Sequence, residues 1–134
     1  MLKEACLSDL KKKVAPGHCI IVHSEGEKGL GPSKDIFQAF FLLKKKYERE
    51  YMKGSAEAHN QAYKDSNYEE KFRKQILSDD LAMMTLDELS DMSKEEDIYL
   101  VCYEGNTKAC HRRILLRICE EEFGAIVQVD GVEP

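Results

Sequence analysis

One short segment, LVCYEGNTKACHRRILL, concentrates side chains that could do chemistry. They are two thiols, a carboxylate, an imidazole and a guanidinium, supplied by Cys102, Cys110, Glu104, His111 and Arg112. The apolar residues after Cys110 predict a helix, so this thiol lies at a helix N-terminus beside two basic side chains, a setting that lowers a thiol pKa. The same helix amides can bind an anion. Cys110 is therefore a candidate nucleophile, with Glu104 and Cys102 as further catalytic candidates. The alternative is that Cys110 is a small buried apolar side chain.

Arg112 and His111 are the candidate ligand-binding residues of this segment. On a helical wheel both lie above the apolar face that points to the sheet, in the first turn of the helix. Burying an unpaired guanidinium is costly, so Arg112 must either pair with a carboxylate or bind an anion. Glu104 is the nearest carboxylate in the sequence, and it lies on the same side of its strand as Cys102. The charged side chains predicted to face solvent are Arg113, Arg117, Glu120 and Glu121.

His23 is a third candidate ligand-binding residue, because it ends the first purely apolar strand predicted from the sequence. Sulfur and nitrogen ligands for a metal are present, but the chain has no C-x-x-C pair and no second cluster at zinc-finger spacing. We therefore predict no metal site, and no motif identifies a cofactor. The potential metal ligands are Cys102, Cys110, His111, His18 and His23.

Two kinds of thiol enzyme place a cysteine in a loop between a strand and a helix. Tyrosine-phosphatase-like enzymes need an arginine after five spacer residues, but Lys108 follows Cys102 at that spacing and Leu116 follows Cys110. A rhodanese-like sulfurtransferase needs a loop of amides that holds a persulfide. The loop CYEGNTKA has the length and a glycine for this role but lacks the usual arginine. The phosphatase interpretation is therefore weak, and sulfur transfer stays an alternative.

The elements that must position these residues alternate between strands and helices. Apolar runs predict strands at 18–22, 98–103 and 125–130. Residues 2–14 predict either a short helix or a strand followed by a helix. Further helices are predicted from a Ser33 cap to about Met52 with Gly54 beyond its end, from Ser55, from Asn67, over 85–89 with Thr85 as cap, and over 109–123 before Gly124.

This order of elements predicts an α/β fold. Strands separated by helices form right-handed parallel crossovers, so we expect one small three-layer Rossmann-like domain over residues 1–134, with a short, mainly parallel sheet and helices in excess. Ligands bind outside the carboxyl ends of such strands, and the loops 23–32 and 103–109 are predicted to face each other there. The side chains expected in the core include Ile36, Phe37, Phe40, Phe41, Leu43, Tyr47, Tyr51, Cys6, Cys19 and Cys119.

The charge and hydropathy of the chain argue against several classes of partner. The net charge of −5 gives no reason to expect nucleic acid or an anionic membrane. No apolar run is long enough to span a bilayer, and the first residues lack the apolar centre of a signal peptide. Five cysteines, an odd number, favour a reduced cytoplasmic protein. A homo-oligomer remains an open alternative.

The strand ending in C-x-E, the variable loop and the CHR that begins an apolar helix resemble the family called domain of unknown function 488. Three further segments are similar to it: GLGPSKDIF, YEEKFRKQIL and ACLSDLKK. The resemblance implies a Rossmann-like α/β fold and a pocket around the polar residues, but no established reaction. Some members carry an aspartate–arginine element early in the chain, where this sequence has IIVHSEGEKG.

Three functions are compatible with these observations. In the first, the pocket binds a small anionic ligand such as a nucleotide or a phosphorylated metabolite. The helix amides and Arg112 hold the anion, Glu104 orients Arg112 or acts as base, and Cys110 or Cys102 can serve as nucleophile. In the second, the chain is a thiol-dependent enzyme of sulfurtransferase type that uses Cys110 or Cys102. In the third, Glu104 and Arg112 form a structural pair, and the protein is a non-catalytic interaction protein.

Overall fold

The computed structural model describes residues 1–11, 18–22, 29–51 and 54–133. Its centre is a parallel sheet in the order β1-β3-β2. The strands are β1 (Leu2–Cys6), β2 (His18–Ile21) and β3 (Ile98–Cys102). The register pairs Cys6 with Cys102, so both strands point their carboxyl ends to the same edge. The α/β class with a parallel sheet is confirmed, whereas the three-layer, Rossmann-like assignment stays a prediction.

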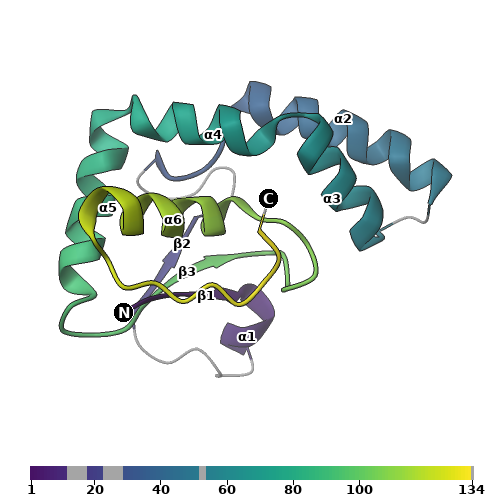
Figure 1. The fold of residues 1–134 in the computed structure, drawn as a ribbon. Coiled ribbons are helices and arrows are strands. Elements are labelled where there is room, and N and C mark those ends of the chain that lie inside the picture. The colour runs from purple at the N-terminus through teal and green to yellow at the C-terminus, as the bar shows by residue number, and fades with distance from the viewer. Residues whose placement is uncertain (12–17, 23–28, 52–53, 134) are drawn as a thin grey trace.

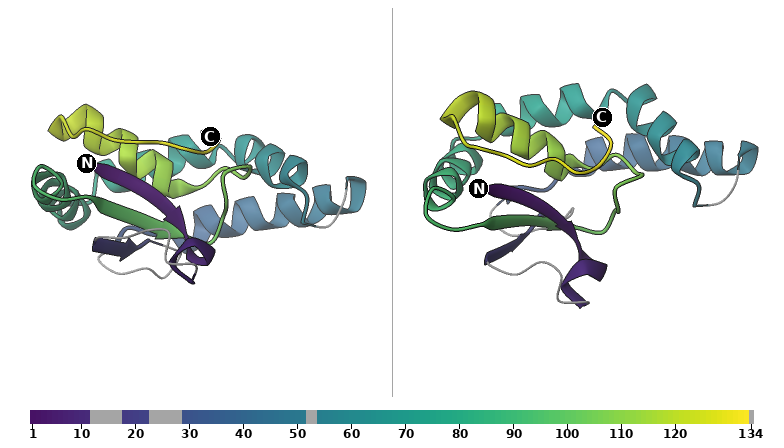
Figure 2. Two further views of the ribbon diagram at one scale, coloured as in Figure 1. Left: turned by 90° about the horizontal axis from the view of Figure 1, so that it is seen from below. Right: turned by 60° about the horizontal axis from the view of Figure 1, so that its bottom comes forward.

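Helices outweigh strands in the described chain, as expected. They are α1 (Leu7–Lys11), α2 (Lys34–Glu50), α3 (Ala56–Asp65), α4 (Tyr68–Leu77), α5 (Asp80–Met92) and α6 (His111–Phe123). Figure 1 shows α6 lying across one face of the sheet, and Figure 2 shows α1 on the other side. None of the helices in the described parts of the chain is long and apolar enough to cross a membrane.

Several predicted helix ends are confirmed by capping contacts. The hydroxyls of Ser33 and Ser55 accept hydrogen bonds from the amides of Ile36 and Ala58, at 3.4 and 3.1 Å. Gly124 ends α6 in the left-handed conformation, with φ of 66°. Local chemistry therefore fixes these boundaries. Asn67 does begin α4, but through its own left-handed backbone, and among the described residues its side chain makes no capping bond.

The prediction that Thr85 begins a short helix is wrong. Thr85 lies inside α5, where its hydroxyl donates to the carbonyl of Leu81 at 3.0 Å. The cap of α5 is Asp79, whose carboxylate accepts from the amides of Leu81 and Ala82 at 3.1 and 3.2 Å. An aspartate accepts two amides here and adds negative charge at the positive end of the helix, so the helix begins earlier than the Thr85 pattern indicated.

The two ends of the chain also differ from the prediction. Residues 2–14 realise the second alternative, a strand followed by a helix, as far as the described residues extend. Residues 125–130 form no strand, and their backbone pairs with that of β1 at the bridge between Leu2 and Val127. The ladder ends because the amide of Asp130 donates to the carboxylate of Glu4, at 2.9 Å, instead of to a strand carbonyl.

The aromatic face of α2 belongs only partly to the core. Phe40 is buried, but Phe37 and Phe41 are 38% and 39% exposed and Tyr51 is 56% exposed. Phe37 and Phe41 line a pocket, and Figure 1 shows that α2 and α3 extend together beyond the sheet. The predicted end near Met52 lies outside the described residues. Cys119 is fully buried as expected, whereas Cys6 and Cys19 are only half-buried.

Candidate functional site

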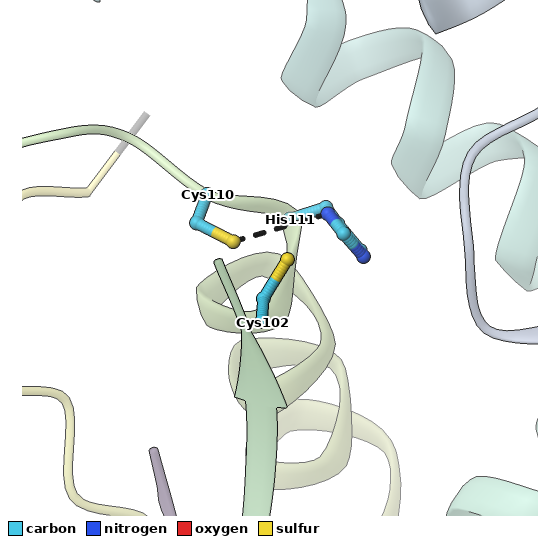
Figure 3. Close-up of side chains that lie close together, drawn as sticks. All are labelled: Cys102, Cys110 and His111. Atoms are coloured by element: carbon cyan, nitrogen blue, oxygen red, sulfur yellow. Dashed lines mark hydrogen bonds between the residues drawn. The ribbon is translucent and has the colours of Figure 1, made fainter. Parts of the chain in front are cut away.

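The polar cluster lies where β3 ends and α6 begins. Cys102 is the last residue of β3, and Cys110 is the N-cap of α6 in an extended conformation, so a short loop brings the two thiols back together. Figure 3 shows both sulfur atoms and the ring of His111 gathered at this junction. The structure therefore brings together the two cysteines and the histidine that the sequence singled out.

Close contacts join these side chains. The Cys110 Sγ lies 3.9 Å from the His111 Nδ1, and the Arg112 Nη1 donates to the same sulfur at 3.7 Å. The Cys102 thiol lies 3.5 Å from a carboxylate oxygen of Glu104. The other ring nitrogen of His111, Nε2, contacts the carbonyl oxygen of Val22 at the end of β2, which only accepts hydrogen bonds. Nε2 therefore carries a hydrogen and Nδ1 faces the sulfur.

The surroundings of Cys110 and His111 favour a thiolate beside an imidazolium. Burial raises the pKa of Cys110, but the Cys102 hydrogen bond and the charges of His111 and Arg112 outweigh it, so this pKa lies well below its ordinary value of 9.0. Burial lowers the pKa of His111, but the Cys110 thiolate and the Val22 carbonyl outweigh burial and raise it. Each charge thus stabilises the other, and the thiolate is the reactive form of cysteine.

The other two candidates hold their protons more tightly. Hydrogen bonding to Cys110, followed by burial, raises the pKa of Cys102, so this side chain stays a thiol that can donate to its neighbours. Burial and the negative charge of Cys110 raise the pKa of Glu104 above its ordinary value of 4.5. A carboxyl group whose pKa is moved toward neutrality is better suited to exchange protons.

The cluster opens into a pocket of about 220 Å³. Cys102, Glu104, Cys110 and His111 line one side, and aromatic side chains from α2, α3 and α4 line the rest. The pocket lies beyond the carboxyl end of β3, the edge at which a parallel sheet was expected to bind a ligand. A larger hollow of about 990 Å³ is lined by α3, α4 and residues near the chain's end, away from the thiols.

Arg112 does not have the partner that the sequence suggested. Its guanidinium is fully buried and binds Glu4 on β1, through Nε and Nη2, both at 2.9 Å. The carboxylate of Glu104 faces Cys102 instead. Arg112 therefore lies behind the pocket wall, where it contributes positive charge to Cys110 and is not free to hold an anion.

Arg113 was predicted to face solvent, and this prediction is wrong. Arg113 is fully buried, and its Nε donates to both oxygens of Glu4, at 3.0 and 3.1 Å. Its remaining nitrogens donate to the carbonyls of Lys108, Val132 and Gly105 at 2.6, 2.8 and 3.0 Å. The helical wheel assigned this side to solvent, but residues 130–132 fold back over it.

Glu4 is the central charged residue that the sequence reasoning missed. Burial raises the pKa of Glu4, but the bonds from Arg113 and the Asp130 amide and the charge of Arg112 outweigh burial and lower it below 4.5. A signal was present in the sequence. In the strand LKEAC, the side chain of Glu4 lies on the same face as those of Leu2 and Cys6, and a carboxylate on an inward face needs a cation.

The potential metal ligands named from the sequence fall into two groups. His23 lies outside the described residues. His18 is half-exposed on β2 and contacts Glu96 at 3.9 Å. Among the described residues, the ligand atoms of Cys102, Cys110 and His111 lie within 4.8 Å of one another, a sulfur and nitrogen set that a thiophilic metal ion accepts. The missing C-x-x-C pair argued against such a set, but the fold assembles one from a strand end and a helix start.

Comparison with known families gives one result. Residues 22–122 match the profile DUF488-N3a, which is described as the active DUF488-N3 subclade. Neither a comparison with curated proteins nor one with solved structures gave a match. The matched region covers more than half of the chain and includes both thiols, His111 and the aromatic side chains of the pocket. The chain therefore belongs to the DUF488 family.

Proposed function

We propose that this chain is a thiol-dependent enzyme whose nucleophile is Cys110. The observation that carries the proposal is the buried contact between the Cys110 Sγ and the His111 Nδ1, which lies in the lining of a pocket rather than in the packed core. A structural cysteine in an apolar core keeps its proton. Cys119 is an example, because burial raises its pKa to about 11. The family profile, whose description contains the word active, supports catalysis.

In the proposed reaction, the Cys110 thiolate attacks an electrophilic atom of the ligand. A lone pair of the sulfur forms the new bond, and the leaving group departs with the electrons of the bond that breaks. His111 donates its Nδ1 proton to that leaving group. The Cys110 sulfur and the His111 ring therefore both become neutral as the covalent intermediate forms. Glu104, with its raised pKa, is placed to accept the proton of the molecule that releases the intermediate.

Sulfur transfer is the form of this chemistry that the pair of thiols favours. A donor such as thiosulfate would pass its outer sulfur to Cys110, forming a sulfur–sulfur bond, while sulfite leaves with the bonding electrons. The Cys102 thiol, within 4.8 Å of the Cys110 sulfur, would donate a hydrogen bond to the persulfide. The backbone amides at the start of α6 would stabilise the same negative charge.

An anionic ligand remains compatible with this proposal, but with different partners. Arg112 is occupied by Glu4, so an anionic group on the ligand would meet Lys44 and the protonated His111, both of which line the pocket. Such a group would lie near the nucleophile. The third alternative predicted a structural ion pair between Glu104 and Arg112. In the structure, Glu4 forms such pairs with Arg112 and Arg113.

The pH dependence of alkylation by iodoacetamide tests the nucleophile. While the pH is below the pKa of an ordinary thiol, about 8.5, the alkylation rate rises about tenfold for each unit by which the pH increases. We expect the rate at Cys110, followed by peptide mass spectrometry, to stay nearly constant between about pH 6.5 and 8 because the thiolate is already formed. Cys110→Ser should abolish this reaction, and Cys6→Ser, the matched change at a half-buried thiol outside the pocket, should leave it unchanged. Ordinary thiol kinetics at Cys110 would reject the proposal.

A further inference from the structure

Two buried polar atoms in side chains that line the pocket have no hydrogen-bond partner. They are the Nδ1 of His59 and the hydroxyl of Tyr63; the Tyr63 ring lies against Tyr68, but neither atom meets a partner at hydrogen-bond geometry among the described residues. His59 is 2% exposed and Tyr63 is 4% exposed. Buried polar groups in native proteins are nearly always paired, so each such atom needs an explanation. Because both side chains line the same pocket as Cys110, a ligand in that pocket would supply the missing partners.

The hydrogen bond of the His59 Nε2 determines whether the unpaired Nδ1 can donate or accept. Nε2 lies 2.7 Å from the carbonyl oxygen of Ala109, which can only accept, so Nε2 carries the hydrogen. Burial lowers the pKa of His59 to about 4, so the ring is neutral at pH 7. Nδ1 therefore has a lone pair, and its partner in the ligand must be an N–H or O–H donor.

Tyr63 needs the opposite kind of partner. Burial raises the pKa of Tyr63, so its hydroxyl keeps its hydrogen and can donate it to a ligand oxygen or nitrogen. Tyr63 follows His59 by one turn of α3, and the two rings are nearly parallel, with centroids 5.9 Å apart. A ligand that lies along this face of α3 can therefore present its donor and its acceptor to the two side chains together.

The walls of the pocket define the rest of the ligand. Phe40 packs its ring against His59, Tyr63 and Tyr68, with centroids 5.0 to 5.7 Å apart, and Tyr63 stacks on Tyr68 at 4.0 Å. Such walls favour a flat apolar body. The volume of about 220 Å³ lies below the roughly 300–1,000 Å³ of sites for drug-sized ligands, so a single ring system fits better than a whole nucleotide.

We propose that the pocket recognises a small planar heterocycle by a lactam-like edge, whose N–H donates to the Nδ1 of His59 and whose carbonyl accepts from the hydroxyl of Tyr63. The ligand class is that of pyridones, pyrimidinones and purinones. The inference rests on the proposed function, since it names the substrate class of the same site. Held by this edge, the ring lies in the pocket that Cys110 and His111 also line, where the thiolate can reach it.

Matched ligand probes test this proposal on the unmodified protein. Thermal unfolding is followed with 2-pyridone, which has the N–H and the carbonyl, with N-methyl-2-pyridone, which lacks the N–H, and with pyridine, which lacks both. Binding to the native state raises Tm by mass action. We expect 2-pyridone to raise Tm and the other two to bind at least about fivefold more weakly, because each leaves a buried polar atom unpaired. Equal affinities for 2-pyridone and its N-methyl derivative, or no shift with any probe, would overturn the inference.

Protein variants separate recognition from chemistry. Tyr63→Phe should weaken 2-pyridone binding about fivefold, and Tyr99→Phe, the same change on β3 outside the pocket, should leave it unchanged. Selective 2-pyridone binding with an unreactive Cys110 would remove the proposed function and keep this inference. A reactive Cys110 that 2-pyridone does not protect from iodoacetamide would remove the inference and keep the function.

Discussion

Glu4 holds two buried guanidinium groups at once. Its carboxylate binds Arg112 and Arg113, and the amides of Asp130 and Gly131 complete its shell at 2.9 and 3.4 Å. Arg112 also contacts the Cys110 sulfur, so the carboxylate positions the cation that helps to form the thiolate. Glu4 is therefore a positioning residue that acts on the site through Arg112.

Replacing Glu4 should be strongly destabilising. Glu4→Gln removes one charge and leaves two buried guanidinium groups without their counter-ion, and breaking a buried pair in this way costs about 3–5 kcal/mol. Urea unfolding measures the loss. The matched control is Glu120→Gln, which breaks a half-exposed pair with Arg117 and should cost less than about 1 kcal/mol. Equal losses in the two variants would contradict the role given to Glu4.

The same residue predicts a response to acid. The pKa of Glu4 is lower in the folded chain than its ordinary value of 4.5. Its contribution to stability is therefore present above pH 4.5 and is lost as the pH falls through the lower folded value. The difference in unfolding free energy between the native chain and Glu4→Gln should shrink below pH 4.5, and a constant difference across this range would count against the assignment.

At this scale, the sequence predicted local clusters better than distant pairs. Cys102, Glu104, Cys110 and His111 came together as expected because a single strand, loop and helix hold them. The partner of Arg112 comes from the first strand, more than one hundred positions away, and the cover of Arg113 comes from residues 130–132. A helical wheel predicts neither the partner of Arg112 nor the cover of Arg113. It also could not predict that His59 and Tyr63 line the pocket.

Helix boundaries show the same division. Ser33, Ser55 and Gly124 set the ends of their helices through contacts within a few residues, so their sequence signals were sufficient. The start of α5 offered two competing local signals, at Asp79 and at Thr85. Packing favours Asp79, because Ala82 is buried along with Leu86 and Leu89, so the buried face of the helix already begins before Thr85.

Two alanine substitutions compare those signals directly. Asp79→Ala removes the side chain that accepts two amides, and we expect a loss of about 1 kcal/mol in the free energy of unfolding. Thr85→Ala replaces a mid-helix threonine by the best helix former and should change stability by less than about 0.7 kcal/mol. Thermal unfolding of the two variants gives the comparison, and a larger loss at Thr85 would restore the boundary that the sequence predicted.

The whole molecule is closed by its two ends. Residues 125–132 run beside β1 and over α6, as Figure 1 shows, and contribute a bridge at Leu2 and the carbonyl of Val132 to Arg113. The sequence indicated a third strand here because alternate apolar residues favour one. The apolar pattern could not predict that the carboxylate of Glu4 would bind the amides of this segment.

Gly131 is the position where this closure is tightest. A Cβ there would lie 2.1 Å from the Nη2 and 2.3 Å from the Cζ of Arg113, and the buried guanidinium is fixed by its carbonyl partners. Gly131→Ala should therefore cost about 1–3 kcal/mol in urea unfolding. At Gly105 a Cβ would meet no described atom within 4 Å, so Gly105→Ala is the control. An unchanged stability for Gly131→Ala would show that the tail is not held against Arg113.

The contacts of Glu4 also set an order of events during synthesis. Glu4 leaves the ribosome first, its two arginines follow more than one hundred residues later, and Asp130 and Gly131 come last. The first strand also gains its partners late, because Leu2 pairs with Ile98 and Val127. The cations that favour the Cys110 thiolate take their places only when this long-range set closes. Under the proposed function, Cys110 therefore becomes the reactive thiol only in the finished fold.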